Sequence, residues 1–167
     1  MPFCWQCEIF YDRHFLEIRT NNGLSYAPYA YFDGGLTPSA NIGVSTTDPN
    51  KYIQVFNKLV DKTKKGFTEE EVRNMKTTYI TSQYYKDETN AAQGSSLASN
   101  EVLYITIGDG LLTLNEELKN ITSKDVTAAF NKYITNLSWV YQGDPAKVES
   151  KLYMQTDSHR KTAASNF

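Results

Sequence analysis

The sequence lacks the features on which several classes of protein depend. It has no run of about 18 consecutive apolar residues, so we predict no membrane-spanning helix. Its 17 basic and 19 acidic residues nearly balance, which gives no electrostatic reason to bind nucleic acid or an anionic membrane surface. No glycine-rich phosphate loop with its lysine and no G-x-S-x-G nucleophile turn is present. Nucleotide-binding and serine-hydrolase functions therefore find no support.

Histidine and cysteine are scarce, which limits metal and redox chemistry. The histidines are His14 and His159, and the cysteines are Cys4 and Cys7. The letters H-F-L-E from position 14 begin like the inverted zinc motif H-x-x-E-H, but position 18 holds isoleucine. We therefore predict no complete zinc site here and a packed role for His14 on an apolar helix face. The C-W-Q-C pair can be a redox pair, half of a zinc site, or an incidental feature.

Tyrosine, in contrast, is abundant, with 12 residues in a chain of 167. Its ring buries area while its hydroxyl stays wet, which suits half-exposed clefts and ordinary tyrosine-rich cores alike. The length fits one domain with a core of its own.

The order of helix and strand signals predicts an α+β fold. Apolar periodicity, caps such as Asp48-Pro49 and the boxes that begin at Thr68 and Thr122, and glycine stops mark the elements. We expect helices at 10–20, 48–65, 68–86, 89–104, 122–134 and 146–154, strands at 25–32, 40–46 and 137–142, and a loop at 108–110. Helices on one side of a mainly antiparallel sheet would form the layers. Three strands are few for so many helices, so we expect part of the sheet to lie outside this chain, most simply before residue 1.

One stretch, RTNNGLSYAPYAYF from Arg19 to Phe32, raises a choice between structure and chemistry. A cation in the last helical turn favours the helix dipole, which accounts for Arg19. Tyr26 can be explained as a strand residue that covers the sheet, on the same face as Ala30 and Phe32. The alternative is that both residues belong to a reaction site.

The quoted residues resemble a known family. F-L-E-I-R-T-N-N-G-L-S-Y at 15–26, Asp48-Pro49, K-G-F-T-E-E-E-V at 65–72, I-T-S-K-D-V at 121–126 and K-Y-I at 132–134 are similar to the C-terminal, non-metal half of a pitrilysin/insulinase-family (M16) zinc peptidase, most of all the bacterial two-domain type. The resemblance implies the M16/LuxS-MPP-like metallohydrolase fold. Such proteins pair two homologous domains, and the partner half carries H-x-x-E-H and the zinc, in cis or in trans.

The resemblance also implies roles for particular residues. Arg19 and Tyr26 would contact the scissile peptide carbonyl and its transition state across the interface with the partner. The border of the substrate cleft would be formed by Gly23, Leu24, Ser25, Ala27 and Tyr29. The chain itself would hold no cofactor and would be inactive alone. The alternative function is a non-catalytic scaffold of the same fold, and the expected compartment is the periplasm or cell envelope, with the cytoplasm as alternative.

The start of the chain departs from the family pattern. Residues 1–9 do not resemble the strands and helix that precede the motif in the family, so we expect either a domain that is truncated at its N-terminus or a gene fragment with a foreign N-terminus. The predicted organisation is an atypical segment at 1–9, a partial M16 C-terminal domain at 10–154 and a polar tail at 155–167.

Overall fold

The computed structural model describes residues 3–33, 39–86, 88–104, 118–135 and 137–154. Within them the protein is mostly helical with one small antiparallel sheet, which is compatible with the expected α+β class. No helix in these ranges is long and apolar enough to cross a membrane. In chain order the elements are α1 (Phe3–Phe15), the π-helical turn η1 (Leu16–Asn21), β1 (Tyr29–Asp33), β2 (Ser39–Gly43), α2 (Pro49–Lys64), α3 (Glu69–Lys86), α4 (Asn90–Tyr104), α6 (Ser123–Tyr133), the 3-10 turn η2 (Pro145–Lys147) and α7 (Ser150–Tyr153).

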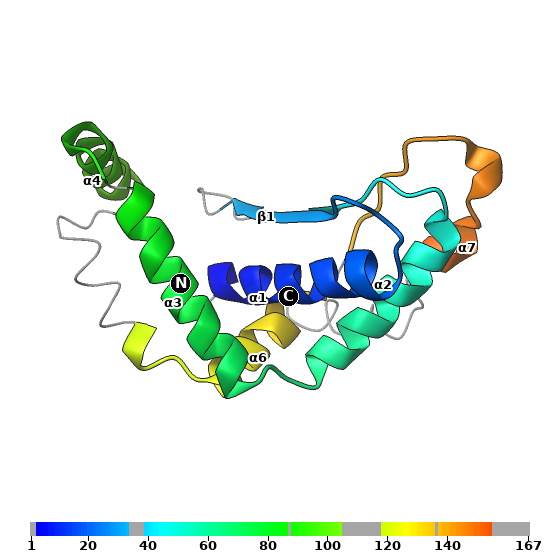
Figure 1. Cartoon of the computed structure of the whole chain (residues 1–167), viewed down its shortest axis with the longest axis horizontal. Helices are drawn as coiled ribbons and strands as arrows, with labels where there is room; N and C mark the ends of the chain where they lie inside the picture. Colours follow the sequence, from blue (N-terminus) through cyan, green and yellow to red (C-terminus); the bar gives the residue numbers. More distant parts are fainter. Residues whose placement is uncertain (1–2, 34–38, 87, 105–117, 136, 155–167) are drawn as a thin grey trace, which may run out of the picture.

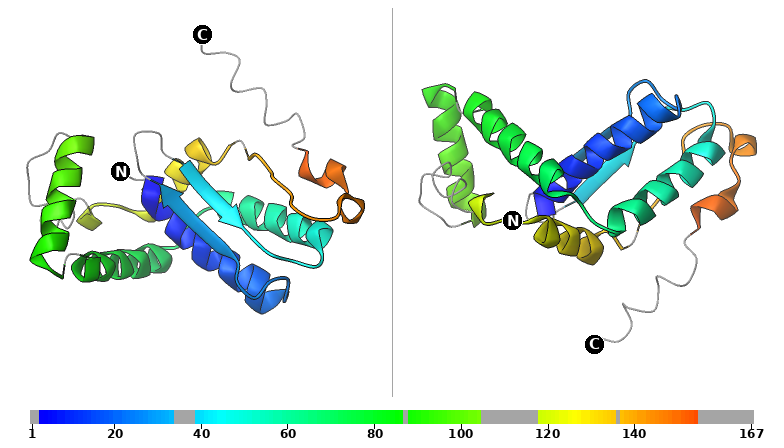
Figure 2. Two further views of the ribbon diagram at one scale, coloured as in Figure 1. Left: turned by 90° about the horizontal axis from the view of Figure 1, so that it is seen from above. Right: turned by 60° about the horizontal axis from the view of Figure 1, so that its bottom comes forward.

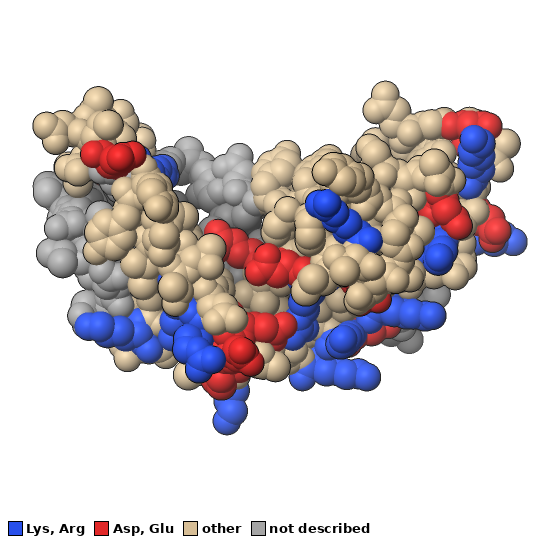
Figure 3. All heavy atoms as spheres, in the orientation of Figure 1, with Lys and Arg blue, Asp and Glu red and all other residues tan. Residues whose placement is uncertain are grey.

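Helix α1 lies at the centre of the molecule. It runs beneath the β1–β2 hairpin and contacts α2, α3 and α6 (Figure 1). The α3–α4 pair extends away from this centre on one side, and α7 lies at the opposite end (Figures 1 and 2). Charged side chains gather mainly along the lower edge of the view in Figure 3, whereas the upper middle is largely uncharged. Among the described elements, helices cover only the face of the hairpin that lies over α1 (Figure 1).

Aromatic side chains fill the core beneath α1. The ring of Phe10 lies 5.9 Å from that of Phe56 and 5.3 Å from that of Phe130, and Phe67 packs 5.6 Å from Phe130. These residues come from α1, α2, α6 and the α2–α3 link, so burial of their apolar surface joins the helices.

The three predicted helix starts are confirmed. The Asp48 carboxylate accepts from the Lys51 backbone N–H at 3.0 Å, with Pro49 next in the chain. Thr68 and Thr122 each open a capping box with the acidic residue three positions later. The caps satisfy N–H groups that a helix end leaves without partners.

A partly buried ion pair connects α1 to the α2–α3 corner. The Arg13 guanidinium donates from Nε and Nη2 to the two carboxylate oxygens of Glu71, at 2.6 and 2.7 Å, and Nη2 also donates to the Gly66 carbonyl at 3.0 Å. Its carbon lies 4.6 Å from the centre of the Phe67 ring. Glu71 is also the capping-box partner of Thr68. One carboxylate thus joins the start of α3 to α1.

The hairpin has the alternation that its sequence predicts. Tyr29 pairs with Gly43 and Tyr31 with Asn41 in antiparallel register. Both tyrosines are more than half exposed, and their rings stack with centres 6.4 Å apart. Ile42, in contrast, packs against the core.

Two predicted boundaries near the N-terminus were wrong. Helix α1 begins at Phe3 instead of residue 10, because residues 3–9 contain no glycine or proline to stop a helix. The first strand begins at Tyr29 instead of Ser25, because Leu24 and Ser25 are packed inward and Pro28 has no N–H for a ladder.

The C-terminal expectations were also wrong in part. Residues 137–142 form neither helix nor strand, so the sheet has two strands within the described residues. The helix expected at 146–154 is divided into η2 and the single turn of α7. The loop expected at 108–110 and the tail from 155 lie outside the described residues.

Candidate functional site

The arginine and the tyrosine of the opening motif come together at the end of the first helix. α1 widens into the π-helical turn η1, and the chain then reverses at Gly23, whose φ of 59° lies in the left-handed region. Backbone bonds from Gly23 to the Arg19 carbonyl at 3.2 Å and from Leu24 to the Ile18 carbonyl at 2.9 Å close the turn. The reversal places Tyr26 back over Arg19.

Arg19 lies against two aromatic rings. Its guanidinium carbon is 4.3 Å from the centre of the Tyr26 ring and 5.0 Å from that of Phe15, both within the range of a cation–π contact. Tyr26 is 80% exposed. Within the described residues no hydrogen bond or ion pair involves the guanidinium or the Tyr26 hydroxyl. The stacking therefore orients a cation while leaving its donors available.

Sequence reasoning missed the residues that support this turn. Glu17 accepts from the Asn21 side chain at 3.0 Å and from that of Asn22 at 3.1 Å, and Asn22 also donates to the Glu17 carbonyl at 2.9 Å. Phe15 lies four residues before Arg19, a spacing that brings side chains together on a helix and could have revealed it.

The residues predicted to border a substrate cleft are placed differently from one another. Leu24 and Ser25 are buried, each 9% exposed, so their side chains are turned away from solvent. Gly23 and Ala27 are exposed, and Tyr29 lies on the open face of the hairpin. Substrate binding by all five stays a prediction.

His14 is a packed residue, as expected. It is fully buried, stacks on Phe10, and its Nε2 lies 3.1 Å from the Tyr52 hydroxyl. Burial lowers the pKa of the imidazole to about 4, so it is neutral near pH 7.

The described residues do not assemble a metal centre. They include no group of three or more His, Cys, Asp or Glu that could hold an ion. Glu17, the acidic residue of the broken zinc motif, is bonded to Asn21 and Asn22. The side chains of Cys4 and Cys7 lie outside what the structure describes, so their role stays open.

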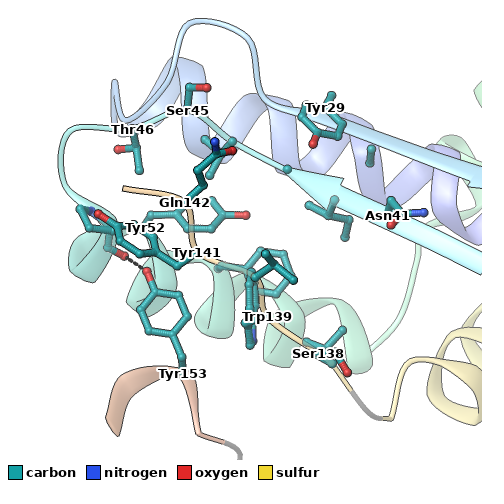
Figure 4. Close-up of a pocket in the computed structure, with 18 of the residues that line it drawn as sticks. Tyr29, Asn41, Ser45, Thr46, Tyr52, Ser138, Trp139, Tyr141, Gln142 and Tyr153 are labelled. Atoms are coloured by element: carbon teal, nitrogen blue, oxygen red, sulfur yellow. Dashed lines mark hydrogen bonds between the residues drawn. The ribbon is translucent and has the colours of Figure 1, made fainter. Parts of the chain in front are cut away.

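A groove of about 1100 Å³ lies on the other side of the hairpin, beside β2. Its floor includes Tyr52 and Trp139, whose ring centres are 6.4 Å apart, and Tyr153, whose hydroxyl donates to the Pro49 carbonyl at 2.6 Å (Figure 4). Neither Arg19 nor Tyr26 lines it. Sequence reasoning did not find the groove, because its walls are far apart in the chain.

Comparison with known proteins agrees with the resemblance that the motifs suggested. A family model described as the Peptidase M16 inactive domain matches residues 8–79, from α1 into α3, and so includes the Arg19–Tyr26 turn. A search of curated proteins found no match. Over residues 8–79 the chain is thus similar to the inactive domain of the M16 peptidases.

Proposed function

We propose that this chain is the non-metal half of a zinc metalloendopeptidase and supplies Arg19 and Tyr26 to a reaction centre on a homologous partner domain. The observation that carries the proposal is the stacked Arg19–Tyr26 pair, whose donors have no partner among the described residues. The family match supports the coarser statement that the chain is a non-catalytic half of an M16 peptidase.

The chemistry of the two side chains suits a peptide carbonyl. A guanidinium presents several N–H donors in a fixed plane, and a phenol adds one O–H donor. Donors aimed at an oxygen that gains negative charge stabilise the transition state more than the ground state. The zinc ion of the partner domain would supply Lewis-acid activation, and this chain would supply the donors on the opposite side of the peptide.

The turn prepares these donors before a substrate arrives. Two rings limit where the Arg19 guanidinium can move, and Glu17 holds the asparagines that shape the turn. Preorganised donors lose less conformational entropy when they bind, so the geometry supports their use as donors to the substrate carbonyl.

Reconstitution with an H-x-x-E-H half tests this function. Hydrolysis of a fluorogenic peptide by the two-domain assembly should fall about 10- to 1000-fold in kcat with Arg19→Ala and with Tyr26→Phe, by the scale of a lost oxyanion donor. Tyr26→Phe keeps the ring that stacks on Arg19, so any activity that this variant loses would be due to the missing hydroxyl. Arg73→Ala and Tyr85→Phe, both exposed on α3, are the matched controls.

The same assay distinguishes the proposed catalytic role from the alternative function as a non-catalytic scaffold. If the chain binds the zinc-bearing half but both variants keep full activity, the catalytic role of the pair is wrong and the scaffold function is favoured. Binding measured by size-exclusion chromatography for each variant shows whether any lost activity reflects lost assembly.

A further inference from the structure

The groove beside β2 is bordered by two chain segments, and each has a backbone edge without a strand partner among the described residues. In the described sheet β2 pairs with β1 alone, so its other edge faces the groove. Across the groove, residues 138–142 run alongside β2 as coil (Figure 2, left). No backbone hydrogen bond within the described part of the chain joins Ser138–Gln142 to another segment. Rows of donors and acceptors thus border the groove on two sides.

Residues 138–142 have the character of a strand without a neighbour. Trp139 points inward, with its ring 5.1 Å from that of Phe56, whereas Ser138 is exposed and Val140 is 95% exposed. This alternation has the period of an extended chain, and Trp, Val and Tyr favour strands. The strand that the sequence predicted at 137–142 is therefore not formed, because no neighbouring strand among the described residues pairs with it.

Neither edge carries the features that protect an open edge. Proteins usually protect an open strand edge with lysine, proline or a bulge, because it pairs readily with other chains. β2 reads S-A-N-I-G and residues 138–142 read S-W-V-Y-Q, without charge or proline. Among the described residues the charged ones that line the groove are Asp144, which caps η2, and Lys147, the last residue of η2. A groove between unprotected edges, whose charged lining is confined to the end at η2, fits a peptide strand better than a charged ligand.

We propose that this groove takes an extended strand of a partner polypeptide, added between β2 and residues 138–142. Five residues of each border span about 16 Å, so the occupant has about five residues in register. Main-chain hydrogen bonds supply affinity in this mode, and alternate side chains that enter the groove supply specificity. The side chains that face Tyr52 and Trp139 would be apolar and uncharged. The proposal does not depend on the function of Arg19 and Tyr26, which do not line the groove.

Hydrogen–deuterium exchange of the full chain with a capped peptide, acetyl-KTVTVTVK-amide, tests the proposal. We expect amides in 39–43 and 138–142 to exchange at least about tenfold more slowly with about 1 mM peptide, while the turn at 19–26 is unchanged. The control peptide has proline in place of its central valine, which removes a ladder donor. Equal protection by both peptides, or none by either, would overturn the proposal.

Substitutions in the border segment sharpen the test. Neighbouring residues of an extended chain direct their N–H groups to opposite sides, so of Val140→Pro and Tyr141→Pro one should abolish peptide protection and the other keep it. Val140→Ala keeps the N–H and should bind as the wild type does. Binding by both proline variants contradicts strand addition. If the peptide-free chain is a dimer with these amides already protected, the groove belongs to a second copy and the proposal is wrong.

Discussion

His14 shows how a residue that suggests chemistry in the sequence can serve packing in the fold. Its position resembles the first ligand of an inverted zinc motif, yet it is fully buried against Phe10, Tyr52 and Phe56. The neutral imidazole makes one hydrogen bond there, between Nε2 and the Tyr52 hydroxyl, while its buried Nδ1 has no partner among the described residues. A charged imidazole would have to lose its hydration without an anionic partner.

The depressed pKa of His14 predicts how stability changes with pH. Unfolding raises the pKa from about 4 to its ordinary value of 6.5. As the pH falls, the imidazole of the unfolded chain therefore binds its proton at a higher pH than that of the folded chain. Stability that is present above pH 6.5 is lost as the pH falls toward 4. His14→Gln should remove up to about 3 kcal/mol of this pH dependence in urea unfolding. Identical pH profiles for wild type and variant would contradict the assignment.

Glu71 should affect the pH dependence of stability in a lower pH range than His14 does. Its hydrogen bonds from Arg13, followed by those from Thr68, lower its pKa from 4.5 to about 2. Stability that is present above pH 4.5 should therefore be lost as the pH falls toward 2. Arg13→Ala should destabilise the fold by about 1–3 kcal/mol near pH 7. The difference in the free energy of unfolding between this variant and the wild type should shrink below pH 4.5. Arg73→Ala, measured by the same chemical unfolding, is the control.

At the scale of elements, two glycines differ in whether their backbone conformation requires glycine. Gly23 has φ of 59°, and a Cβ there would meet no atom within 4 Å, so the constraint is the backbone conformation alone. Gly94 lies inside α4, where a Cβ also meets nothing and a helical backbone favours alanine.

The two glycines give a paired prediction. Gly23→Ala should destabilise the chain by about 1–2 kcal/mol, because alanine is strained in the left-handed region. Gly94→Ala should stabilise α4 by about 0.5–1 kcal/mol, because it lowers the entropy of the unfolded chain and fits the helix. Thermal unfolding followed by circular dichroism measures both, and changes of the same sign would contradict the account.

At the scale of the whole molecule, sequence predicted what depends on neighbours in the chain. The caps at Asp48, Thr68 and Thr122 involve residues three apart, so their spacing sufficed. The Arg13–Glu71 pair joins residues 58 positions apart and has no local signal. By resemblance Arg19 and Tyr26 were expected to serve one site, but their contact with each other depends on the π-helical turn, which no residue pattern predicted.

Another prediction at this scale concerns the isolated chain. The described residues assemble no cluster of metal ligands, so the purified chain with added zinc should not hydrolyse a fluorogenic peptide. Metal analysis of the wild type beside Cys4→Ser and Cys7→Ser would show whether the C-W-Q-C pair holds an ion. Zinc-dependent hydrolysis by the chain alone would contradict the assignment to a non-metal half.

The Arg13–Glu71 pair also has a mechanical consequence. α3 and α4 form an arm that extends from the body of the molecule (Figure 1), and the start of α3 is fastened to α1 through this carboxylate. The capping bonds of Glu71 to Thr68 lie at the same point, so one group both begins the helix and sets its direction. The buried side chains of Val72 and Met75 also fix the first turns of α3 in the core, so releasing the pair would remove one of several links that set the direction of the arm.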